Sequence, residues 1–167
     1  MKYAIVYSSK TGNTKALAEH LRTALPEEDC LYFGPPDEVA RKAPLLFVGF
    51  WTDKGVCDEE AAAFLQQTKC AQIALFGTAG FGEKPQYFDL ILQRTAALLP
   101  VGCRVLSGFM CQGRMLQSVR DRAAAALAAT PDDARAQRMI VNFDHARTHP
   151  DEMDFVRLVA WAQKMIA

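Results

Sequence analysis

YAIVY at residues 3–7 runs directly into SSKTGNT at residues 8–14, and a helical pattern begins at Lys15. The first segment is almost entirely apolar, as in a buried strand, and the second is a loop of hydroxyl side chains and glycine. The first N–H groups of a helix have no partner within the helix, and the helix dipole makes that end positive. A strand, such a loop and a helix start therefore predict an anion site. Because Lys10 is the only charged residue of the loop, the site suits a phosphate monoester held mainly by neutral donors.

The pattern Ser-x-Thr-Gly-Asn-Thr after an N-terminal strand resembles the phosphate loop of flavodoxins, which bind flavin mononucleotide (FMN). The loop lacks the Gly-Lys-Ser/Thr ending of a Walker loop and the Gly-x-Gly-x-x-Gly of a dinucleotide turn. The alternative is a cluster of polar residues that only caps the helix. By resemblance, the residues that hold the FMN phosphate are Ser9, Lys10, Thr11, Gly12, Asn13 and Thr14.

Apolar strand-like runs alternate with helical patterns along the chain, which indicates a parallel sheet with helices on both faces. Asp58 is expected to cap the second of these helices, and residues 132–149 are expected to form a partly helical surface excursion. The expected strands are residues 2–7, 31–33, 45–50, 73–77 and 104–110, and the expected helices are 13–25, 59–68, one ending before Pro100, 116–129 and one from about 150 to the C-terminus.

Together with the flavodoxin resemblance, this pattern predicts one α/β domain over residues 1–167. The expected architecture is a flavodoxin-like, doubly wound parallel sheet of five strands in the order 2-1-3-4-5, with helices on both faces. In such an open sheet, ligands bind beyond the carboxyl ends of the strands, at the point where the strand order reverses. The loops after the first, third and fourth strands are therefore expected to share one edge.

The second and third of these loops supply candidates for contact with a flavin ring. By resemblance, the second loop binds the flavin through Phe50, Trp51 and Thr52, and the Trp51 side chain stacks on the flavin ring. A stacked aromatic pair is favourable. The alternatives are a Trp51 that closes the sheet edge or meets a protein partner, and a Tyr87 that packs in a helix. The third loop is expected to contribute backbone N–H groups, or an aromatic ring for the other flavin face, from Thr78, Ala79, Gly80, Phe81 and Tyr87.

Two further segments narrow the resemblance. CQGRM at residues 111–115 and HPDE at residues 149–152 resemble a branch of the flavodoxin-like proteins. This branch includes an accessory protein associated with a bilirubin-reducing enzyme. The first segment ends a strand, so it is expected near the ligand edge. The alternative is a simple turn, in which Gly113 supplies the backbone angle and Cys111 is a small buried hydrophobe.

Composition excludes several classes of protein. The chain has 19 basic and 19 acidic side chains, so no net field attracts it to nucleic acid or to a membrane surface. The five cysteines are odd in number and form no C-x-x-C pair, which favours reduced thiols in a cytoplasmic protein. No apolar run approaches the roughly 18 residues of a membrane span. The three histidines lack zinc-ligand spacing, so neither a metal site nor a catalytic residue is expected.

These observations predict a small FMN-binding redox protein that passes electrons to or from a partner oxidoreductase. The flavin carries the chemistry in such a protein, which agrees with the lack of an acid–base constellation. An electron carrier or redox accessory protein is favoured over a stand-alone enzyme. The alternatives are an FMN-dependent reductase of a small organic substrate and a flavodoxin-fold accessory module that does not use flavin.

Overall fold

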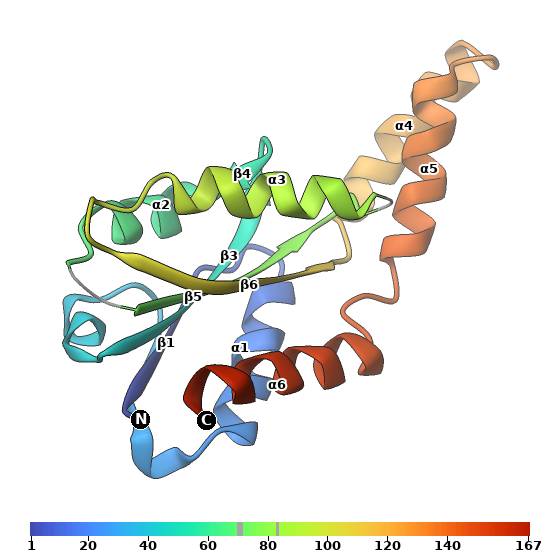
Figure 1. Ribbon diagram of the computed structural model, residues 1–167. Coiled ribbons are helices and arrows are strands. Elements are labelled where there is room, and N and C mark those ends of the chain that lie inside the picture. Colours follow the sequence, from blue (N-terminus) through green and yellow to red (C-terminus); the bar gives the residue numbers. More distant parts are fainter. Residues whose placement is uncertain (70–71, 83) are drawn as a thin grey trace.

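The computed structural model describes residues 1–69, 72–82 and 84–167. Its centre is a sheet of five parallel strands in the order β2-β1-β3-β5-β6 (Figure 1). A short strand, β4, pairs with β3 in the antiparallel direction. The expected order 2-1-3-4-5 is therefore confirmed, with β4 as an addition. The bounds are β1 Tyr3–Tyr7, β2 Cys30–Gly34, β3 Leu45–Asp53, β4 Val56–Cys57, β5 Gln72–Ala79 and β6 Arg104–Gln112.

Helices cover both faces of this sheet, and two more extend from its edge (Figure 1). One face carries α1 (Asn13–Ala24) and α6 (Glu152–Ile166), and the other carries α2 (Glu59–Gln66) and α3 (Pro85–Ala96). Two short 3-10 helices lie at Glu27–Asp29 and Glu38–Lys42. Beyond the end of β6, α4 (Gln117–Ala129) and α5 (Ala134–Ala146) form a hairpin that projects from the body (Figure 1).

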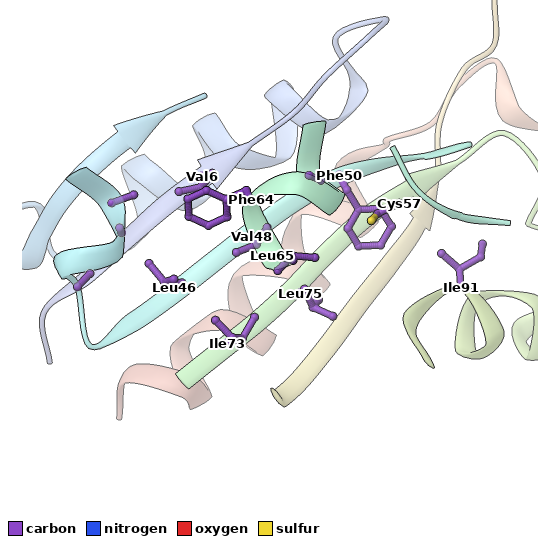
Figure 2. Packing of buried hydrophobic residues seen from close by; sticks show 14 of the residues in the cluster. Val6, Leu46, Val48, Phe50, Cys57, Phe64, Leu65, Ile73, Leu75 and Ile91 are labelled. Carbon is purple, nitrogen blue, oxygen red and sulfur yellow. The ribbon is translucent and has the colours of Figure 1, made fainter. Parts of the chain in front are cut away.

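The core lies on both sides of the central strand β3. Leu46, Val48 and Phe50 face the side of α2 and α3, where Figure 2 shows them near Phe64 and Leu65. Residues 45 and 47 face the opposite side, with α1 and α6. A strand with buried residues on both faces must be apolar at every position, which explains the unbroken apolar run.

The chain between α4 and α6 is more ordered than its charged sequence indicates. Residues 132–149 were expected to be partly helical, and the structure has a continuous helix of 13 residues there. Asp133 caps α5 by accepting a hydrogen bond from the Ala136 N–H at 3.0 Å. Arg120 of α4 pairs with Asp144 of α5 through two hydrogen bonds, and this guanidinium holds the pKa of the Asp144 carboxyl below its usual range.

The cysteines of the described residues form no disulfide. Cys30, Cys57, Cys103 and Cys111 are free, and Cys70 lies outside the described residues. Burial raises the pKa of the Cys57 thiol to about 11 and also raises the pKa of Cys111. Neither thiol is therefore a reactive thiolate at neutral pH. Within the described ranges, none of the helices has the length and apolarity needed to cross a bilayer.

Candidate functional site

The loop between β1 and α1 leaves several backbone N–H groups available to a ligand. Gly12 adopts a φ of 92°, a left-handed conformation that favours glycine, and α1 begins at the next residue. The Ser9 hydroxyl oxygen accepts hydrogen bonds from the N–H groups of Gly12 and Lys15. Within the described part of the chain, no acceptor meets the N–H groups of Lys10, Thr11, Asn13 and Thr14. The loop is therefore a cradle of donors at the positive end of a helix.

Asp58 joins this first loop to the loop that follows β3. The carboxylate is only 2% exposed and accepts a hydrogen bond from the Ser8 hydroxyl at 2.7 Å. It also accepts hydrogen bonds from the N–H groups of Trp51 at 3.2 Å and Ala61 at 3.1 Å. The last of these is the expected helix cap. The hydrogen bond to Ser8 has no local sequence signal, because Ser8 lies 50 residues away.

Three threonines connect the carboxyl ends of β3 and β5 with the start of α1. The Thr14 hydroxyl donates to the Phe50 carbonyl oxygen at 3.0 Å, and its oxygen lies 3.0 Å from that of the Thr78 hydroxyl. The Thr52 hydroxyl donates to the Thr78 carbonyl oxygen at 2.9 Å. The hydroxyl of Thr14 and the ring of Phe50 are buried. These side chains therefore position the three loops from within the protein.

The segment after β6 packs directly against the first loop. The Asn13 side-chain amide donates to the Arg114 carbonyl oxygen at 2.8 Å, while its own oxygen is buried without a partner among the described residues. A Cβ on Gly113 would lie 2.5 Å from the Asn13 amide nitrogen, so only glycine permits this approach. Arg114 N–H donates in turn to the His149 carbonyl oxygen. An orphaned buried acceptor beside an anion cradle indicates a missing donor, such as a ligand hydroxyl.

A cavity of about 160 Å³ lies between these loops. On one wall the Lys10 ammonium stands 5.0 Å from the ring centroid of Trp51. On another, Met115 packs so closely on Gly80 that a Cβ at Gly80 would lie 2.6 Å from the Met115 Cγ. The cavity is lined by Lys10, Thr11, Asn13, Trp51, Thr52, Thr78, Ala79, Gly80, Arg114, Met115, Leu116 and Val119.

Phe81 and Tyr87 do not line this cavity. Both line a separate cleft against α5, together with Lys84 and Arg138. Tyr87 belongs to the first turn of α3 and packs in part against the core, while Phe81 is 45% exposed. The structure therefore brings Lys10, Thr11, Asn13, Trp51 and Thr52 together with Thr78, Ala79 and Gly80, and it adds Met115 and Leu116 to them. Gly12, Thr14 and Phe50 do not line the cavity, and Ser9 lines an adjoining hollow. The CQGRM segment was the only sequence signal for Met115.

Residues 4–163 match the model of the flavodoxin domain family. The chain belongs to this family. Two curated relatives are flavodoxin-like domain-containing proteins named BilS. The one from Clostridium symbiosum is 44% identical over 92% of this chain and 90% of its own length. The one from Clostridioides difficile is 30% identical over 99% and 97%. The flavodoxin resemblance, and the branch that the two additional segments indicated, are confirmed.

Solved structures of flavodoxins share the fold. A short-chain flavodoxin associated with a bacterial microcompartment has a TM-score of 0.54 and 18% identity, covering 67% of this chain and 84% of its own. A flavoprotein of Lactobacillus acidophilus, solved in complex with FMN, has a TM-score of 0.51 and 14% identity, covering 65% and 92%. At these identities the similarity supports the doubly wound fold alone.

Proposed function

We propose that this flavodoxin-family chain is an FMN-binding redox protein that passes electrons to or from a partner oxidoreductase. The observation that carries the proposal is the set of available N–H groups at the start of α1, in a loop with the flavodoxin phosphate sequence and beside Trp51. Membership of the family and the branch of its relatives support the same cofactor and a dedicated partner.

The phosphate end of FMN fits the residues present. The N–H groups of the first loop, the Thr11 hydroxyl and the Lys10 ammonium surround the space before α1 and would hold a phosphate dianion. The unpartnered Asn13 side-chain oxygen would accept a hydrogen bond from a hydroxyl of the ribityl chain. The donor set and the orphaned acceptor together match a phosphorylated polyol.

The cavity beside Trp51, where the flavin ring would bind, is small. Its 160 Å³ lie below the roughly 300–1,000 Å³ of small-molecule pockets, so the ring system needs more room. Lys10 and Met115 both line the cavity and have long, unbranched side chains that change rotamer readily. We expect these two side chains to move when the ring enters, while the buried threonines and Asp58 keep the loops in place.

When bound, FMN supplies one- and two-electron transfer. The protein controls the charge beside it. A shallow hollow of about 750 Å³ adjoins Lys10 and Trp51, and it is lined by Asp53, Asp58, Glu59 and Glu60. Negative side chains near the ring oppose added negative charge there, and they would lower the potential at which the flavin is reduced.

Reconstitution and anaerobic mixing test the proposal. The protein purified with FMN should show a bound-flavin absorption spectrum, and NAD(P)H alone should leave that flavin oxidised for minutes. After chemical reduction, the protein should pass electrons rapidly to a one-electron acceptor such as cytochrome c. Failure to retain flavin would favour an accessory module without cofactor. Rapid reduction by NAD(P)H, with turnover of an organic acceptor, would favour a direct reductase.

Replacing Trp51 by alanine should weaken FMN binding without unfolding the protein. Stacking of an aromatic side chain on a base-like ring contributes about 1–3 kcal/mol, so the dissociation constant should rise by about tenfold or more. The fold should persist, because the Trp51 ring is only half-buried and its backbone N–H still reaches Asp58. Fluorescence titration measures the affinity, and Trp51→Phe should recover most of it. Equal affinities of the alanine variant and the parent would show that Trp51 does not stack on the flavin.

A further inference from the structure

Two adjoining clefts separate α5 from the body of the protein. Their volumes are about 620 and 450 Å³, and both are lined by Gly82, Arg138 and Asn142. We call the pair the α5 cleft. It is larger than the cavity beside Trp51, and the proposed function does not use it. Its volumes fall within the range of about 300–1,000 Å³ that is typical of small-molecule sites.

Side-chain hydrogen bonds hold α5 at a fixed place across this cleft. The Asn142 side-chain amide donates to the Gly80 carbonyl oxygen at 2.9 Å. Gln112 donates to the same carbonyl at 3.0 Å and to the Asn142 side-chain oxygen at 3.1 Å. We call these three residues the Asn142 bridge. Because the bridge connects α5 with the third loop and with the end of β6, the cleft exists before any ligand binds.

The charged side chains that the structure describes in the lining of the α5 cleft are basic, and two histidines line its larger part. The smaller part is lined by Lys84, Arg135 and Arg138, and the larger part by Arg138, His145 and His149. The lining residues that the structure describes include no Asp or Glu. Among the described residues, neither arginine forms an ion pair. These basic side chains contrast with the acidic side chains that line the hollow beside Trp51.

One imidazole that lines the larger part of the cleft is held in a fixed orientation. His149 Nδ1 lies 2.6 Å from the carboxylate of Asp154, which is 1% exposed. The carboxylate fixes the imidazole, so the remaining ring nitrogen is available on the side of the cleft that His149 lines. A fixed imidazole and a pair of arginines are typical of the few placed polar groups of a ligand pocket.

Apolar side chains provide the rest of the lining. Phe81 and Tyr87 stand on the side of the third loop and α3, and Met139 and Val141 stand on α5. Phe81 and Val141 are 45% and 57% exposed, which is unusual for large hydrophobic residues placed around one concavity. An aromatic or aliphatic ligand body would cover these side chains, and the burial of their apolar surface would contribute favourable binding free energy.

We propose that the α5 cleft binds an organic anion with an apolar or aromatic body and at least one carboxylate. Arg135 and Arg138 bind the carboxylate, because guanidinium groups pair with carboxylates through two parallel hydrogen bonds. The apolar side chains receive the body. The concave shape favours a small molecule over the flat surface of an acidic protein. The site is separate from the flavin cavity, so it does not depend on the proposed function.

Calorimetric titration with pyrenebutyrate, an aromatic carboxylate, tests the proposal, and its neutral analogue pyrenebutanol serves as the matched ligand. FMN-treated protein should bind one pyrenebutyrate and bind pyrenebutanol about tenfold more weakly, because the alcohol lacks the charge-assisted hydrogen bonds. The double variant Arg135→Gln/Arg138→Gln should lose about tenfold for pyrenebutyrate alone. Val141→Asp removes an apolar side chain and places a carboxylate in the cleft, so it should weaken binding of both ligands, and of pyrenebutyrate more than of pyrenebutanol.

Arg122→Gln is the matched control variant, because Arg122 is an exposed arginine of α4 that lines neither part of the cleft. It should bind pyrenebutyrate like the parent, and thermal melting should show that all variants remain folded. Three results would overturn the proposal: no binding of pyrenebutyrate, equal affinity for the acid and the alcohol, or displacement of pyrenebutyrate by saturating FMN. Failure of the protein to bind FMN leaves the titration valid, so the two proposals are tested separately.

Discussion

FMN is expected to bind at least a thousandfold more tightly than riboflavin. The two ligands share the ring and the ribityl chain, and they differ only in the phosphate. The loop before α1 offers N–H groups of Lys10, Thr11, Asn13 and Thr14 that meet no acceptor among the described residues. Hydrogen bonds to a charged group contribute about 1.5–3 kcal/mol each, so three of them account for more than the roughly 4 kcal/mol that a thousandfold requires.

Fluorescence titration of the flavin-free protein with each ligand measures this ratio. Inorganic phosphate provides an internal control, since it should compete with FMN and leave riboflavin binding almost unchanged. Similar affinities for the two flavins would remove the phosphate assignment of the first loop. The stacking prediction for Trp51 would then stand by itself.

Asp58→Ala is expected to cause the largest loss of stability of any single change at the site. The substitution leaves the Trp51 N–H without its acceptor, leaves the Ser8 hydroxyl only the Glu60 carboxylate at 3.2 Å, and removes the cap of α2. An unsatisfied buried donor costs about 1–3 kcal/mol, and a lost cap about 1 kcal/mol. We expect a decrease of about 3 kcal/mol in the free energy of unfolding. FMN affinity should also decrease, because the first two loops lose their common anchor.

Urea unfolding of the flavin-free protein measures the stability change. Asp37→Ala is the matched control, since Asp37 also caps a helix, through the Val39 N–H, but has an exposed hydrogen bond and is far from the loops in the sequence. The control should lose about 1 kcal/mol or less and keep its FMN affinity. If both alanine variants unfold at the same urea concentration, Asp58 acts only as a helix cap.

The sheet could be predicted from the sequence because its signals are local. The apolar run of β3 is continuous because both faces of that strand are buried. The phosphate-binding pattern of the first loop is contained within the seven residues 8–14. The flavodoxin order of the strands followed from the resemblance and was confirmed by the structure. Local patterns suffice where one segment determines its own conformation.

The walls of the site could not be predicted in this way. Asp58 reaches Ser8 across 50 residues, and Asn142 reaches Gly80 across 62. Met115, rather than Phe81 or Tyr87, covers Gly80, because the chain leaving β6 returns over the third loop. The charged sequence of α5 conceals its pairing with α4, where Ala123, Ala136 and Ala146 are buried small residues. These contacts depend on how segments distant in sequence meet.

The Asn142 bridge has a thermodynamic consequence for the two sites that it connects. Gly80 belongs to the lining of the flavin cavity, and Asn142 lines the α5 cleft. If occupation of the cleft shifts the third loop and changes FMN affinity by some factor, reciprocity requires that FMN change the affinity of the cleft by the same factor. Through one shared carbonyl, the amount of bound cofactor and the concentration of an organic anion would then become linked variables.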